Sequence, residues 1–343
     1  MAVITSSKYW EVVFDELQER VEANGREKYL LIGKRYDEAI KSIEDRIIAW
    51  YGRHALDGKI PLKQAYKKLP PDQLEQFREL IKFYLRNWNE ELGYEIGEKP
   101  IDHVEKVSKK DTDAEMLEHL LDEEHLNDTE TWLNVLREYE NKEDVTYFEA
   151  LSIPILNEVE EVSHSTANEL LALLVLTGWT VHHDIAKNLK IQGLAQEALK
   201  KELLKSWASD GVPLYDRFNA NKAKLSTSVK SALVKGFRNE MSVDEVVAEV
   251  SKVMGVGEAA AKRLVVTENT HFSTYATYLA IKEAGYTEYQ YFSRMTANTC
   301  EDCMALHLSI FPLDAYEEGV TAPTLHPYCV CYIKPVLGSE VIK

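Results

Sequence analysis

Apolar side chains recur at the spacing of an α-helix through most of this chain. One stripe consists of Tyr36, Ile40, Ile43, Ile47 and Trp50, with charged residues between its members. Spacings of three and four residues place these side chains on one helix face, which must be buried against another element. The pattern therefore predicts a mainly α-helical fold in which each stripe contributes to a packed core.

Other stripes predict further helices, at Trp10–Val21, Leu74–Trp88 and Leu225–Phe237, and apolar patterns return from Glu169 through Trp207. Because aromatic residues at helical spacing are usually core residues, we interpret Trp10, Phe77, Tyr84 and Trp88 as packing rather than ligand stacking.

Local signals mark several helix ends. Asp72 and Ser242, each followed three residues later by glutamate, fit the pattern that caps a helix start. A long helix is predicted from about Glu258 to Ala284, ending at Gly285. Gly255-Val256-Gly257 lacks the context of a phosphate-binding loop, and we interpret it as a turn between helices.

The carboxy-terminal part differs from the rest, because β-prone residues occur at 289–292, 309–311 and 330–333. We therefore expect mainly α structure, with helical amino-terminal and middle regions and a small α+β carboxy-terminal domain. The predicted regions are 1–92 (helical), 93–160 (acidic and connecting), 161–208 (helical) and 209–343 (the α+β domain).

Charge is concentrated in one part of the chain. Of the net charge of −17, the segment from Glu98 to Glu161 carries −14, with 20 acidic and 6 basic residues. We interpret this segment as a solvated helical face or a mobile linker. No comparable basic cluster occurs, so strong direct nucleic-acid binding is not expected.

Two further observations limit the class of protein. The longest apolar run, Leu170 to Leu176, has seven residues, whereas a bilayer span needs roughly 20. The amino terminus does not resemble a signal peptide, and we expect a soluble protein made in the cytosol without a membrane partner.

The pair His182-His183 is interpreted as capping or surface residues, since adjacent residues point to different sides of a helix.

All four cysteines lie within the last 44 residues, at Cys300, Cys303, Cys329 and Cys331. A C-x-x-C turn can direct two thiolates at one ion, and a tetrahedral zinc site takes four cysteine or histidine ligands. His326 or His307 could replace one thiolate. The leading interpretation is one structural zinc site; disulfides and free buried thiols are the alternatives.

The carboxy-terminal third resembles the phage Mu F-like minor head proteins, the phage head morphogenesis family. Weaker similarity to longer members from phages of Gram-positive hosts extends towards the amino terminus, at Tyr9-Trp10 and Trp50-Tyr51. The resemblance in the last third is carried by Asp210-Gly211, Asp216-Arg217, Arg263, Thr267-Glu268, Ala284-Gly285-Tyr286, Cys300-Glu301-Asp302-Cys303, Ile310-Phe311 and His326-Pro327-Tyr328-Cys329-Val330-Cys331.

Three positions depart from the family pattern. Val266 and Val330 stand where arginine is usual, and Leu308 where glycine is usual. The two missing arginines argue against a shared anionic ligand, whereas the cysteine and histidine positions are intact.

The resemblance implies a minor capsid protein of a tailed bacteriophage. Such a protein would bind the portal protein and other head proteins, act in head assembly and DNA ejection, and reside in the virion, with the host cytoplasm as its site of assembly. The competing hypothesis is a metal-dependent nuclease or effector enzyme that uses His326 or His307 at the cysteine cluster. The sequence has no H-E-x-x-H, G-x-S-x-G or Walker A motif, so we expect no catalytic residues.

Overall fold

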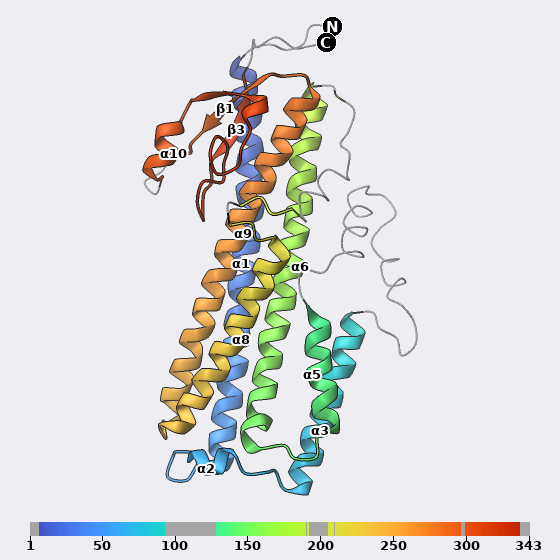
Figure 1. The fold of residues 1–343 in the computed structure, drawn as a ribbon, viewed down its shortest axis with the longest axis vertical. Coiled ribbons are helices and arrows are strands. Elements are labelled where there is room, and N and C mark those ends of the chain that lie inside the picture. Colours follow the sequence, from blue (N-terminus) through green and yellow to red (C-terminus); the bar gives the residue numbers. More distant parts are fainter. Residues whose placement is uncertain are drawn as a thin grey trace.

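Four long helices lie side by side and form an elongated bundle (Figure 1). The computed structural model describes residues 7–92, 128–189, 191, 205–208, 210–295 and 299–336. The apolar faces of the bundle helices share one core that extends from Phe14 to Ile333. The long helices are α1 (Ser7–His54), α6 (Tyr147–Leu189), α8 (Leu214–Arg238) and α9 (Val243–Glu283).

Two shorter helices form a side layer against the amino-terminal part of α6 (Figure 1). These are α3 (Pro71–Glu91) and α5 (Thr129–Asn141), and the short α2 (Leu62–Ala65) precedes them. The side layer has a second hydrophobic core, separate from that of the bundle. Its buried members are Phe77, Ile81, Tyr84, Trp88, Trp132, Leu133, Leu136, Val145, Ala150 and Ile153.

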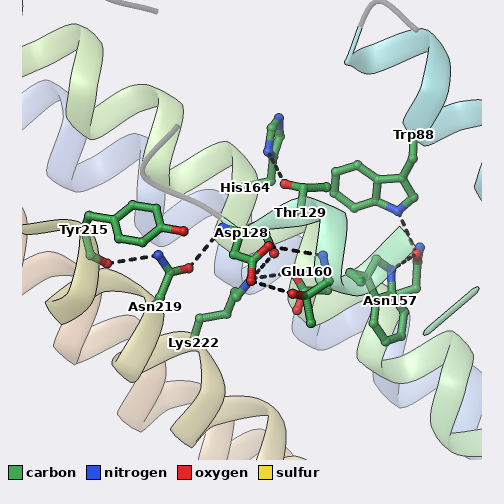
Figure 2. Close-up of polar contacts among 11 residues, drawn as sticks. Trp88, Asp128, Thr129, Asn157, Glu160, His164, Tyr215, Asn219 and Lys222 are labelled. Atoms are coloured by element: carbon green, nitrogen blue, oxygen red, sulfur yellow. Dashed lines mark hydrogen bonds and ion pairs between the residues drawn. The ribbon is translucent and has the colours of Figure 1, made fainter. Parts of the chain in front are cut away.

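Buried polar contacts join this side layer to the bundle, as Figure 2 shows. The indole nitrogens of Trp88 and Trp132 both donate to Asn157 Oδ1 of α6, at 2.9 and 3.1 Å. Lys222 of α8 donates to the carbonyl oxygen of Asp128, which caps α5. These contacts fix the position of the side layer on the bundle, because moving it would leave buried polar groups without hydrogen-bond partners, which is unfavourable.

A small antiparallel sheet lies at the end of the bundle near the start of α1 (Figure 1). Its central strand β1 (Glu288–Phe292) pairs with β2 (Ile310–Pro312) and β3 (Tyr332–Pro335), so that Gln290 faces Ile310 and Lys334. The helix α10 (Glu301–Leu306) lies between β1 and β2 in the chain, and the 3₁₀-helix η2 (Leu313–Ala315) follows β2.

The sheet is tied to α1 by polar side chains. Asp15 of α1 accepts hydrogen bonds from Tyr332 Oη at 2.8 Å and Lys334 Nζ at 3.1 Å. Glu22 of α1 forms an ion pair with Arg294, at 2.6 Å. The amino-terminal helix and the carboxy-terminal strand therefore support each other, although more than 300 positions separate Asp15 from Tyr332.

The predicted fold class is confirmed: the described residues are mainly helical, and a small sheet with a cysteine and histidine cluster lies near the carboxy terminus. Each predicted β-prone segment contains or overlaps a strand. Ser242 and Glu245 form the predicted capping box. The helix predicted to reach Ala284 ends at Glu283 with Ala284 as its C-cap, and Gly285 adopts a φ of 81°.

Three local predictions are wrong. Gly255 and Gly257 lie inside α9 rather than in a turn. Leu225 of α8 packs so closely against Gly257 that a side chain at this position would clash, which explains a glycine within the helix. Asp72 does not cap α3, which instead begins at Pro71 after Pro70. His182 is buried, with Nε2 3.1 Å from Glu283 of α9, so it is not a surface residue, whereas His183 is exposed.

The structure also locates the predicted regions. The limit at residue 92 falls just after α3, whereas the limit at 160 falls inside α6, which continues to Leu189. Most of the acidic segment and the predicted apolar positions Leu194, Ala198 and Leu203 lie outside the described residues. Within the described part, Glu158 pairs with Arg46 and Glu160 with Lys222, so these acidic residues hold helices together rather than form a solvated face.

Candidate metal centre and the adjoining cavity

The first arm of the cysteine cluster is the start of α10. Cys300 is the N-cap residue of this helix, and its sulfur accepts a hydrogen bond from the Cys303 backbone N–H at 3.3 Å. The C-x-x-C spacing therefore places both thiols on the first helical turn. Cys303 is buried, whereas Cys300 is partly exposed.

The second arm is the turn that leads into β3. The backbone N–H of Cys329 donates to the carbonyl oxygen of His326, and Tyr328 between them has a left-handed φ of 63°. Cys329 and Cys331 are both buried, and their alternate positions place the two thiols on the same side of the chain.

The donor atoms form two groups that share Cys303. One group is Cys300, Cys303 and His326, the other is Cys303, Cys329 and Cys331, and within each group all donor atoms lie within 4.8 Å of one another. Cys303 Sγ is 3.9 Å from Cys329 Sγ and 3.4 Å from His326 Nε2. Tetrahedral zinc with ordinary bond lengths separates two sulfurs by about 3.8 Å, and a sulfur from a nitrogen by about 3.6 Å. The cluster can therefore hold a metal ion.

The imidazole of His326 is oriented as a ligand. Its Nδ1 lies 2.8 Å from the carbonyl oxygen of Pro327. A carbonyl oxygen can only accept, so Nδ1 carries the proton and the lone pair of Nε2 points towards Cys303. A second hydrogen bond that fixes the tautomer in this way is typical of histidines that bind metals.

The pKa values of the thiols are shifted because the thiols lie close enough to form hydrogen bonds with one another. Hydrogen bonds donated by the Cys303 and Cys329 thiols lower the pKa of Cys331 to about 2. The pKa of Cys303 is raised, first because its thiol donates to Cys329 and Cys331. The hydroxyl of Tyr291 on β1 contacts Cys303 Sγ at 3.3 Å. The lowered pKa of Cys331 favours a buried thiolate, which is the form of cysteine that binds a cation. The cysteine spacing gave no indication of Tyr291, although its strand was predicted.

His307 lies outside both donor groups. Its Nδ1 accepts a hydrogen bond from the Ser293 backbone N–H at 3.1 Å, and its ring packs edge-on against Phe292, 5.3 Å away between centroids. Of the two histidines that the sequence offered as alternative ligands, the structure brings only His326 to the cysteines. All four cysteines are free thiols.

Comparison with protein families bears on the segment that contains this cluster. Residues 223–334 match the family described as Phage Mu protein F like protein. This segment is therefore similar to the phage Mu F-like family. The match covers most of α8, all of α9, nearly all of the sheet and the whole cysteine cluster, and it confirms the resemblance seen in the carboxy-terminal third of the sequence. No curated protein and no solved structure matches the chain. The family supports a phage head morphogenesis protein.

A cavity of about 760 Å³ adjoins the cluster, between the Mu F-like segment and the residues that precede it. Its walls come from the start of α8, the middle of α9, residues 205–208 and the loop between η2 and β3. Five of the positions that carry the family resemblance line it, although they lie up to 64 residues apart in the sequence. They are Arg263, Thr267, Glu268, His326 and Pro327.

Thr267 connects the cavity to the metal centre. Its hydroxyl donates to the carbonyl oxygen of Arg263 at 2.7 Å and accepts from the backbone N–H of Tyr328 at 3.2 Å. The threonine therefore holds the turn of the second cysteine arm against α9. This contact gives Thr267 a structural role that its sequence position did not reveal.

Glu268 is the buried charge of the cavity wall, with 2 % of its surface exposed. Burial raises its pKa to about 7, and the hydrogen bond from Trp207 Nε1, at 2.9 Å, opposes that shift. Trp207 also stacks on His271 at 4.4 Å between centroids. Complete burial lowers the pKa of His271 to about 3, so this imidazole is neutral. In the sequence, Trp207 was predicted only as part of an apolar helix pattern.

Proposed function

We propose that this protein is a minor head protein that binds the portal of a tailed phage and acts in head assembly and DNA ejection. The observation that carries the proposal is the Mu F-like segment at residues 223–334. An elongated bundle supports it, because long helices offer extended surfaces for docking on other head proteins. None of the described helices is long and apolar enough to span a membrane.

We propose further that the cysteine cluster holds zinc as a structural ion. Its donor set offers up to five ligands, and three of the four thiols are buried, as in a closed structural site. Zinc would cross-link α10 to the turn before β3 and so stabilise a small sheet with a limited core of its own. A catalytic site would instead need an open coordination position.

The geometry favours this role over the alternative of a nuclease or effector enzyme. In the described part of the chain, His326 Nδ1 is held by a backbone carbonyl and its Nε2 faces Cys303. His307 accepts from the backbone N–H of Ser293, the residue that follows β1, and lies outside both donor groups. Neither imidazole is placed to activate water beside the cluster, which is the task of a general base.

The test has two parts. First, the chain is co-expressed with the portal protein of the same phage, and both are purified through a tag on the portal. We expect the chain to co-purify and to be present in mature virions, with assembly in the host cytoplasm. Second, phage lacking the chain are examined for head assembly and for DNA release. Failure to bind the portal, together with magnesium- or zinc-dependent nuclease activity abolished by His326→Ala, would overturn the proposal.

A further inference from the structure

The cavity beside the metal centre has the chemistry of a binding site that the proposed function does not use. Its volume of about 760 Å³ is in the range of small-molecule sites. It lies between secondary-structure elements far apart in the sequence, namely α8, α9 and the loop before β3. The charged groups on its walls therefore indicate which ligand it would accept.

Two of these charged groups, Arg217 and Asp210, form an ion pair with each other. Arg217 donates from both terminal nitrogens to the two carboxylate oxygens of Asp210, at 2.8 and 2.9 Å. A bidentate pair of this kind leaves little net charge. The guanidinium of Arg217 lies near enough to Glu268 to favour its ionised form, but Asp210 on the same side disfavours it.

Glu268 therefore lacks a dedicated counter-ion in the described part of the cavity wall. The neutral indole of Trp207 is the one side-chain donor recorded for its carboxylate there. Removing a carboxylate from water is unfavourable unless a cation or several donors replace the water. A position so unfavourable for an unpaired anion is typical of functional sites.

The neighbouring wall adds a second carboxylate and aromatic rings. The side chain of Glu318 is only 6 % exposed; it accepts from Tyr316 Oη at 2.8 Å and lies 3.4 Å from His271 Nδ1. The ring of Trp207 stacks over the same imidazole, on the side of the wall that holds Glu268. Carboxylates combined with aromatic faces favour cationic ligands.

We propose that this cavity binds a guanidinium or primary ammonium group, with Glu268 as its counter-ion. The cation would take the position that water or a proton must otherwise fill beside the buried carboxylate. Lys205 and Arg263 also line the cavity but are exposed residues, so they lie nearer to solvent than Glu268.

The proposal is tested by isothermal titration calorimetry on the full chain at pH 8. The probes are agmatine, 1,4-diaminobutane and inorganic phosphate. We expect agmatine or the diamine to bind, and Glu268→Gln to weaken that binding at least tenfold. Glu268→Asp, which keeps the charge, should retain part of the affinity. Glu19→Gln, a change of an exposed glutamate on α1, is the matched control and should bind as the parent does.

Two measurements make the outcome decisive. Circular dichroism and thermal melting establish that each variant is folded before it is titrated. Unchanged cation binding in folded Glu268→Gln, binding of phosphate alone, or no binding of any probe would each overturn the proposal.

The source of the cationic group is distinguished by a further probe, a short neutral peptide with one central arginine. Binding of the peptide at least tenfold tighter than agmatine would assign the site to a side chain of another protein. Tighter binding of agmatine or the diamine would assign it to a free small molecule. Both results support a site for cations and depend on Glu268, and neither depends on portal binding.

Discussion

Lys222 of α8 and Glu160 of α6 form an ion pair of 3.1 Å whose side chains are only 10 % and 9 % exposed. The same ammonium group donates to the carbonyl oxygen of Asp128 at 2.9 Å, at the start of α5 (Figure 2). Burial raises the pKa of Glu160, and the nearby charge of Lys222 opposes that shift. One lysine therefore neutralises a buried carboxylate and joins the side layer to the bundle.

Lys222→Met should lower the free energy of unfolding by about 3–5 kcal/mol, because it leaves a buried carboxylate without its partner. The double variant Lys222→Met/Glu160→Gln should recover part of this loss, since the uncompensated charge is then removed. Urea denaturation monitored by circular dichroism measures both effects. Lys230→Met, at an exposed position of the same helix, is the control. Equal losses in Lys222→Met and Lys230→Met would show that the pair contributes nothing specific.

Removal of metal should loosen the carboxy-terminal sheet while the helical bundle stays folded. Cys303 belongs to both donor groups, whereas Cys300 belongs to one. We therefore expect Cys303→Ser to reduce the zinc content, about one ion per chain in the parent, more than Cys300→Ser does. Elemental analysis gives the zinc content, and hydrogen exchange of strands β1 and β3 reports the loosening.

Two histidine variants provide the control for the metal prediction. His326→Ala should weaken zinc binding about 10–100-fold or more, because it removes a ligand or the group that orients the cluster. His307→Ala should leave the zinc content unchanged, since this ring lies outside both donor groups. Metal loss in the His307 variant, or a parent protein without zinc whose sheet is equally protected, would contradict the prediction.

The donor set could be predicted from sequence, but the choice of histidine could not. Four cysteines confined to one short segment are informative by themselves, because a shared ion explains their clustering. His307 and His326 are both close to cysteines in the chain. They differ in their backbone partners: the ring of His326 meets the carbonyl oxygen of Pro327, which leaves Nε2 free to face Cys303. That contact depends on the path of the turn at Tyr328.

The helical stripes predicted the bundle, and the errors occurred where a distant segment decides the local structure. Periodicity treated the stripes at 10–21 and 36–50 separately, whereas α1 is one helix from Ser7 to His54. His182 has no neighbour in sequence that reveals its partner, because Glu283 is about 100 residues away. The cavity could not be predicted from the sequence for the same reason, since α9 and the loop before β3 meet only in the folded chain.

The glycine pair in α9 offers a matched test of such a tertiary effect. A Cβ atom at Gly257 would lie 2.7 Å from Leu225 Cδ2 of α8, whereas a Cβ at Gly255 would meet no atom within 4 Å. Gly255→Ala should stabilise the protein by about 0.5–1 kcal/mol, because alanine is the better helix former. Gly257→Ala should instead destabilise it by about 1 kcal/mol or more through overpacking. Chemical denaturation of both variants checks this, and two shifts of the same sign and size would show that α8 does not restrict Gly257.

The contribution of Glu268 to the free energy of unfolding should fall as the pH rises from about 4.5 to about 7. Burial raises the pKa of this carboxyl to about 7 in the folded state, from an ordinary value near 4.5. Over that interval this carboxyl holds its proton in the folded chain and loses it in the unfolded chain, so raising the pH makes its contribution to stability smaller. Glu268→Gln, whose amide oxygen can still accept from Trp207, removes this contribution.

The Gln variant should therefore match the parent near pH 4.5 and exceed its free energy of unfolding by about 2–3 kcal/mol at pH 8. Urea denaturation across this range gives both curves, and Glu19→Gln should follow the parent curve throughout. A gain in stability together with a loss of cation binding identifies a carboxylate retained for a ligand rather than for the fold. Parallel curves for the parent and Glu268→Gln would mean that the carboxylate is already compensated in the folded chain, and that its burial contributes nothing to the pH dependence.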